Sequence, residues 1–271
     1  MPHEVDLIRI RHWFENYVLQ FFTGDDHTDS ALRIKVDHTK NVAIEACRIA
    51  ASLDMNAQQC YLAEIIALLH DIGRFEQFSR YRTYSDRESE DHGRLGVQVI
   101  GTTGVLERFT GEMQSFICSI IGCHNRIALP EMGDPLLLHH LRLLRDADKI
   151  DILRVVTEYY AGYYDGNDAV AIGLPDTPGV TDAVLQSVIE RRMVNMNHVK
   201  SLNDIKLLQI SWVFDLNFPY TSAMVTRRRY LDKLAASLPK TDRVVQALTT
   251  AQLFLQRRCS EERSECECLI P

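Results

Sequence analysis

The sequence predicts an all-α fold, and three observations support this prediction. Apolar residues recur at spacings of three and four through most of the chain, which is typical of the buried face of a helix. No segment shows the sustained alternation of apolar and polar residues that predicts a half-buried strand. Helix-capping residues precede several apolar segments, as Asn56 and the pair Asp134-Pro135 do.

The expected helices fall into an N-terminal and a C-terminal set. The first set is expected at about 4–22, 29–53, 57–70, 89–100, 113–124 and 136–160. Residues 73–88 are polar and rich in turn-forming residues, so they predict an irregular loop in which Gly73 lets the backbone leave the preceding helix. The second set is expected at about 181–194, 203–215, 222–237 and 241–258.

The segment from Gly162 to Pro178 is rich in Gly, Asp and Pro and is the best linker candidate. It predicts a helical core with an N-terminal helix at 1–162, followed by a C-terminal helical extension at 163–258 that packs on this core. The acidic residues 259–271 predict a disordered tail.

Composition restricts the classes of partner. The chain has 271 residues, of which 46% are hydrophobic, so it can bury a full core. A net charge of −7 argues against nucleic acid polymers, whereas a small anionic substrate could still meet locally gathered positive charge. No apolar run approaches the about 18 residues of a membrane span. Seven cysteines, an odd number, favour a reducing compartment over a disulfide framework, so we expect a cytoplasmic protein that binds no membrane.

The stretch Ala67-Leu68-Leu69-His70-Asp71-Ile72-Gly73-Arg74 carries the first candidate site residues. It predicts the end of a buried helix that delivers an imidazole and a carboxylate side by side, and both groups are metal ligands. The alternative is a helix end with a solvated Asp71 and a capping His70.

Other helices offer further ligands. His38, His70, Asp71 and Asp148 would form a site of two imidazoles and two carboxylates, with positions left open for water and substrate. Asp151 shares a helix face with Asp148 and is a candidate to support the ligands. Each histidine alone could equally be a buried or capping residue. His139 and His140 are expected on a solvated helix face.

Five arginines follow the candidate ligands in an otherwise acidic chain. They are expected to form either an ordinary solvated loop or a clamp for an anionic group, because guanidinium groups fit phosphate. The five are Arg74, Arg80, Arg82, Arg87 and Arg94.

Three motifs in one order resemble the HD-domain superfamily of metal-dependent phosphohydrolases. "VDHTKNVAIEACRIA" is similar to the first histidine helix of that family, "LLHDIGRF" to its central motif and "RDADKIDIL" to its last motif. The resemblance covers about residues 30–155, with His38, His70, Asp71 and Asp148 in the ligand positions. His92 in "DHGRLGVQVI" and His124 in "IIGCHN" further resemble members that hold two metals bridged by the aspartate, here Asp71.

The resemblance implies an HD-domain helical bundle with additional C-terminal helices and hydrolysis of a small phosphorylated substrate, a nucleotide or a phosphate ester. It implies divalent metal, and we expect two ions, with Mn, Fe, Co, Mg, Ni and Zn not distinguishable. The alternative is one ion on His38, His70, Asp71 and Asp148, with His92 and His124 as capping residues. Asp71, and also Asp151, would hold or deprotonate the attacking water. Arg74 and Lys149, joined by Arg82 and Arg94, would neutralise the phosphate.

Two other readings stay open. The same ligand order occurs in di-iron oxygenases of the myo-inositol oxygenase type, and a non-catalytic helical scaffold or nucleotide sensor could retain the site. No Gly-Tyr-Pro signature follows His124, so a cyclic dinucleotide substrate is not supported. The sequence leaves open whether the protein forms a homo-oligomer.

Overall fold

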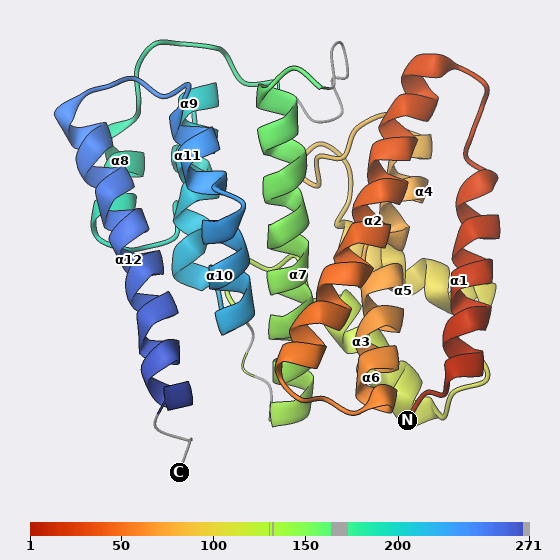
Figure 1. Cartoon of the computed structure of the whole chain (residues 1–271). Helices are drawn as coiled ribbons and strands as arrows, with labels where there is room; N and C mark the ends of the chain where they lie inside the picture. The colour runs from red at the N-terminus through yellow and green to blue at the C-terminus, as the bar shows by residue number, and fades with distance from the viewer. Residues whose placement is uncertain (130, 132, 164–172, 268–271) are drawn as a thin grey trace. The chain divides into compact units, whose positions relative to one another are not determined.

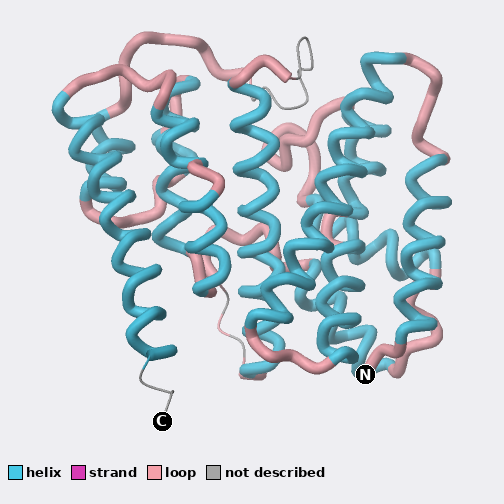
Figure 2. The backbone as a smooth tube through the Cα atoms, in the orientation of Figure 1, coloured by secondary structure: helices cyan, strands magenta, loops and turns pink. Residues whose placement is uncertain are grey.

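The computed structural model describes residues 1–129, 131, 133–163 and 173–267, with side chains described up to residue 260. Throughout this part of the chain Figure 2 shows helices joined by loops and no strand, which confirms the predicted all-α class. No helix among the described residues is both long enough and apolar enough to cross a membrane.

The helices are numbered as in Figure 1. Those of the first half are α1 (Glu4–Leu19), α2 (Asp26–Ser52), α3 (Ala57–Leu69), α4 (Ile72–Tyr81), α5 (His92–Thr103), α6 (Gly111–Ile121) and α7 (Pro135–Tyr160). Those of the second half are α8 (Asp182–Ile189), η1 (Met196–His198), α9 (Leu202–Ser211), η2 (Trp212–Asp215), α10 (Pro219–Arg227), α11 (Tyr230–Ala235) and α12 (Asp242–Glu267).

The chain forms two compact units, and the division between them falls inside α7. The first unit ends at Asp151 and the second begins at Ile152. The linker predicted between Gly162 and Pro178 lies largely outside the described residues. Helix α12 continues to Glu267, through most of the segment in which we expected a disordered tail, and residues 268–271 lie outside the described part.

In the first unit α3 is the central helix. Every residue from Leu62 to Leu69 is buried. It packs against α1, α2 and α6, while α5 packs against α4 and α6. The predicted N-cap Asn56 accepts a hydrogen bond from the backbone N–H of Gln59, so a local signal starts the helix that the core then surrounds.

The loop predicted at 73–88 is wrong in its first part, because residues 72–81 form α4. Ile72, Phe75 and Phe78 lie three residues apart and are buried, so a short amphipathic helix covers the core here. Gly73 lies inside this helix and does not end the preceding one. A Cβ at this position would lie 2.3 Å from the carbonyl oxygen of His92, so the glycine allows α4 and α5 to approach closely.

The solvated face expected for His139 and His140 is also partly wrong. His140 is buried, and its Nδ1 lies 3.0 Å from the carbonyl oxygen of Leu136. Its ring packs edge-on against Phe116, with centroids 5.4 Å apart. It is therefore a core residue of the first unit.

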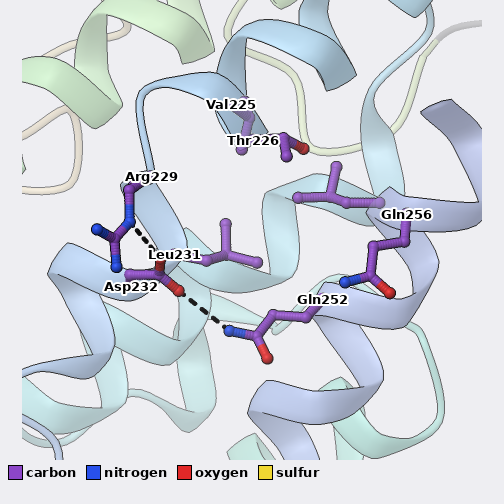
Figure 3. Close-up of a pocket in the computed structure, with 8 residues that line it drawn as sticks. Val225, Thr226, Arg229, Leu231, Asp232, Gln252 and Gln256 are labelled. Atoms are coloured by element: carbon purple, nitrogen blue, oxygen red, sulfur yellow. Dashed lines mark hydrogen bonds and ion pairs between the residues drawn. The ribbon is translucent and has the colours of Figure 1, made fainter.

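In the second unit α12 packs against α8, α9, α10 and α11. The helix expected at 222–237 is divided into α10 and α11, because Arg229 adopts the left-handed conformation with φ of 56°. A pocket of about 240 Å³ lies among α10, α11 and α12 (Figure 3). Its lining residues are Val225, Thr226, Arg229, Leu231, Asp232, Gln252, Leu255 and Gln256.

Candidate metal centre

His70 and Asp71 occupy the junction between α3 and α4. His70 is the residue after the last turn of α3, and Asp71 immediately precedes α4. Both are buried, as expected for polar groups that follow an apolar helix. His70 Nδ1 lies 2.6 Å from the carbonyl oxygen of Ala67, so it donates to that carbonyl and leaves Nε2 free to face the interior.

Helices α2 and α7 bring two further predicted ligands to this junction. His38 Nε2 lies 3.1 Å from Asp148 Oδ1 and 3.6 Å from Asp71 Oδ2. His70 Nε2 lies 3.7 Å from Asp71 Oδ2 and 3.8 Å from Asp148 Oδ1. The four residues that we expected to form one site are therefore brought together.

Asp151 lies on the other side of the His38 ring. Its Oδ2 is 2.8 Å from His38 Nδ1, and the side chain is almost fully buried. The carboxylate thus fixes the ring so that Nε2 faces Asp71, which is the supporting position expected from its helix face. The expectation that Asp151 also acts on a water is not favoured, because the imidazole lies between it and the cluster.

His92 and His124 form a second group on the opposite side of Asp71. Their Nε2 atoms lie 3.4 Å and 3.7 Å from Asp71 Oδ1, and 3.0 Å from each other. His124 Nδ1 lies 2.7 Å from the carbonyl oxygen of Ile121, and His92 Nδ1 lies 2.6 Å from Asp86 Oδ2. Both rings are therefore held with Nε2 toward the aspartate.

These residues fit a pair of divalent ions. Asp71 presents Oδ2 to one histidine pair and Oδ1 to the other, and each group of three could hold one ion. The buried Nε2 atoms of His38 and His70 have no hydrogen-bond partner among the described residues. Ligand atoms about 2.1 Å from a shared ion lie about 3.0–3.4 Å apart, close to the separations found here. Imidazole and carboxylate together suit Mn, Fe, Co, Ni and Zn.

The carboxylates of the cluster are held in their ionised form. Burial alone would raise the pKa of Asp71, but the Lys35 ammonium and His70 hold it well below its usual range. Burial likewise opposes the ionisation of Asp148, and the imidazoles of His38 and His70 keep its pKa well below the usual range. Ionised carboxylates are the forms that bind metal.

The imidazoles differ in their protonation. Burial, together with the charge of Arg74, lowers the pKa of His92 to about 4, so this ring is neutral near pH 7. Burial also opposes protonation of His38, but Asp148 and Asp151 outweigh it and raise the pKa of His38 above its ordinary value. The carboxylates around His38 therefore favour a positive charge at this point, which a metal ion would supply.

Asp86, in the loop before α5, is a supporting residue that the sequence did not reveal. Besides His92, its carboxylate accepts hydrogen bonds from Arg74 Nη1 at 2.8 Å, Gln77 Nε2 at 2.9 Å and Asn125 Nδ2 at 3.2 Å. An acidic residue six positions before His92 was the only available signal, and this loop contains several others.

The four residues predicted to bind phosphate differ in their position relative to the metal-ligand cluster. Arg74 Nη1 donates to Gln77, Asp86 and the carbonyl of Tyr84, so this guanidinium is already engaged by the protein. Arg82 and Arg94 are exposed, and no contact among the described residues joins either to the cluster. Lys149 is buried beside Asp148.

Lys35 is a second residue that the sequence did not reveal. It lies one turn before His38 on α2, and its Nζ is 2.8 Å from Asp71 Oδ2. Its position in an ordinary amphipathic helix gave no sign of this contact.

The fold and the cluster together define an all-helical protein with a candidate binuclear metal centre. Residues 36–153 match the family model described as the HD domain, so this part of the chain is an HD domain. This confirms the resemblance seen over residues 30–155. HD domains bind divalent metals, and the family consists generally of hydrolases. Neither the curated proteins nor the solved structures contain a match to this chain.

Proposed function

We propose that this protein is a metal-dependent phosphohydrolase that acts on a small phosphorylated substrate, a nucleotide or a phosphate ester. The observation that supports the proposal most strongly is the bridging position of Asp71, with a histidine pair on each of its two oxygens. This arrangement suits two ions about 3.5–4 Å apart, as phosphate-hydrolysing enzymes use them.

Divalent ions bound here would lower the pKa of a bound water toward neutrality and polarise a phosphoryl oxygen. The protein's own contribution is to hold the ligands. Asp151 and Asp86 fix His38 and His92, and backbone carbonyls fix His70 and His124. Asp71 is our candidate for orienting the attacking water, because both of its oxygens face the cluster.

The reaction forms a bond between the water oxygen and phosphorus and breaks the ester P–O bond. The proton released by the water ends on the leaving oxygen, directly or through solvent, so a phosphomonoester yields phosphate and an alcohol, and a phosphodiester yields a phosphomonoester and an alcohol. Asp148 is the most exposed of the ligands facing His38, with 20% of its side chain accessible, and substrate would reach the cluster from this side.

The test is turnover of a panel of nucleotides, phosphomonoesters and phosphodiesters with Mn, Co, Mg, Ni, Zn or Fe added. We expect metal-dependent release of phosphate or nucleotide. Asp71→Ala should reduce kcat/KM by more than the about 10- to 100-fold caused by losing an outer partner of a metal ligand. Asp232→Ala, in the surface pocket of the second unit, is the matched control and should leave the rate unchanged.

Turnover that persists in Asp71→Ala, or no turnover with any metal, would contradict the proposal. Iron in protein purified without oxygen, combined with oxygen consumption on a polyol substrate, would favour the di-iron oxygenase reading.

A further inference from the structure

Two features of the cluster show from which side a ligand could enter. The side chains of His38, His70 and Asp71 are at most 5% exposed, whereas those of Lys35 and Asp148 are 19% and 20% exposed. Solvent therefore reaches the ligand group of His38, His70 and Asp71 on the side where Lys35 and Asp148 lie. A substrate that approaches from water meets a lysine at this point.

The contacts of Lys35 allow it to change partner. In the structure its ammonium lies on Asp71 Oδ2, the oxygen that also faces His38 and His70. An ion bound between these two histidines would share that oxygen and repel the ammonium, since like charges about 4 Å apart near a surface cost several kcal/mol. The long lysine stem can then turn outward, because it has several rotatable bonds.

Lys35 also lies beside an aromatic ring in the position that pairs with Asp71. Its Nζ lies 5.4 Å from the centre of the Tyr84 ring, which can stabilise a cation. Tyr84 is fixed in turn, since its hydroxyl donates to the carbonyl oxygen of Ala31 at 3.2 Å and its ring stacks on Phe78 with centroids 4.7 Å apart. The ammonium therefore has a rigid aromatic wall at the accessible edge of the cluster.

The other candidate cation at this carboxylate does not serve the same purpose. Arg74 Nε lies 3.6 Å from Asp71 Oδ1, but its Nη1 is engaged by Gln77, Asp86 and a backbone carbonyl. Moving it would release the loop that orients His92. Lys35 pairs with Asp71 and lies beside the Tyr84 ring, and within the described part of the chain it donates no hydrogen bond to this loop.

We propose that Lys35 is the phosphoryl-binding residue of this site, pairing with Asp71 in the metal-free protein and with a phosphoryl oxygen of the substrate once metal is bound. The inference rests on the proposed phosphohydrolase function and deepens it. Lysine is a mobile point charge that binds phosphate well.

The first experiment measures binding of inorganic phosphate to the metal-loaded protein by calorimetry, together with metal content by elemental analysis. Lys35→Gln should weaken phosphate binding about ten- to a hundredfold, the effect of losing one charged hydrogen bond, and should raise KM while both ions are retained. Lys35→Arg should restore most of the affinity. Lys40→Gln is the matched control, because Lys40 lies on the same helix, is 48% exposed and, within the described part of the chain, pairs only with Glu15.

A second experiment needs no variant. Reductive methylation followed by mass spectrometry should modify Lys35 faster after metal is added and more slowly after phosphate is added, while Lys40 should not change. The inference would be overturned if Lys35→Gln bound phosphate with unchanged affinity or lost metal. It would also be overturned if the methylation rate of Lys35 changed with neither metal nor phosphate.

The two proposals fail in different ways. If the wild-type protein hydrolyses phosphate esters but Lys35→Gln binds phosphate normally, only the role of Lys35 is wrong. If the metal-loaded wild type neither binds phosphate nor hydrolyses any ester, the proposed function fails and the role of Lys35 with it.

Discussion

The metal-ligand cluster of the first unit and the pocket of the second unit differ in the burial and hydrogen bonding of their polar side chains. Around the cluster, His38, His70 and Asp71 are buried, and within the described part of the chain the Nε2 atoms of both imidazoles have no hydrogen-bond partner. Around the pocket, the polar side chains lie at the surface. Arg229 Nε donates to Asp232 at 2.8 Å, and Gln252 Nε2 donates to the same carboxylate at 3.2 Å (Figure 3).

The comparison shows that the hydrogen bonding of buried polar atoms distinguishes a ligand-binding site from an ordinary surface pocket. The pocket has a volume, but its charged groups already neutralise one another and remain hydrated. The cluster concentrates polar atoms whose burial is costly unless a partner satisfies them. Buried atoms that converge without a partner therefore indicate a ligand more strongly than empty space does.

The largest expected effect comes from the close approach of α4 and α5, which places His92 against Asp71. Gly73→Ala would put a Cβ 2.3 Å from the carbonyl oxygen of His92 and 2.5 Å from the backbone nitrogen of Gly96. Both atoms belong to α5, so that helix must move. We expect a loss of at least about 3 kcal/mol in the free energy of unfolding, the upper end of overpacking effects, measured by denaturant titration.

Gly101→Ala, in α5, is the control. No atom of the described residues lies within 4 Å of a Cβ at Gly101, so alanine should be neutral or stabilise by up to about 1 kcal/mol through helix propensity. Equal effects of the two substitutions would show that close packing of α4 on α5 does not hold the cluster together.

Asp86→Asn tests whether the outer partner of His92 matters for the second ion. Burial works against the charge of Asp86, yet its bonds with His92 and the charge of Arg74 lower its pKa, so a carboxylate faces the ring. An amide is a weaker acceptor for His92 Nδ1. We expect the affinity for the second ion to fall about 10- to 100-fold, with metal content moving from two ions toward one at limiting metal.

Asp91→Asn is the matched control for this prediction. Asp91 lies in the same loop, and its side chain is 33% exposed, as is that of Asp86. It caps α5 by accepting from the backbone N–H of Arg94, a role that asparagine also fulfils. A similar loss of metal in both variants would mean that the charge of the loop, and not the bond to His92, sets the affinity.

Much of the fold could be predicted because helix signals are local. The apolar run up to Leu69 and the cap at Asn56 define α3 without reference to the rest of the chain. Helix α4 was missed because its apolar face consists of only Ile72, Phe75 and Phe78 within a polar segment. Its stability depends on tertiary burial, which a local pattern does not report.

The candidate ligands could be predicted for a different reason. His38, His70 and Asp148 lie at recognisable places in three motifs, and the structure brings them together. Asp86 and Lys35 do not occupy recognisable positions in these motifs. Asp86 reaches His92 through a loop conformation, and Lys35 meets Asp71 only because α2 packs against α3, which ends just before Asp71. Contacts of this kind depend on the packing of helices far apart in the sequence.

The smallest expected effect concerns a buried lysine of the second unit. Lys206 is buried, and its Nζ lies 4.8 Å from the centre of the Tyr160 ring. Burial lowers its pKa below the ordinary value, and Asp176 only partly opposes this. The unfolded chain therefore holds this proton more tightly than the folded chain.

A lowered pKa of a lysine makes its charge a cost to folding at neutral pH, and this cost disappears as the pH rises through the folded pKa toward the unfolded one. The free energy of unfolding of the wild type, relative to Lys206→Met, should therefore increase between pH 7 and pH 10.5. Urea titrations of both proteins at several pH values measure this difference. Lys233→Met, an exposed lysine 5.3 Å from the Tyr230 ring, controls for the loss of a lysine–ring contact. A difference that stays flat or falls with pH would show that Lys206 is charged at no cost, and the contrast between Lys206 and Lys35, which pairs with Asp71, would then disappear.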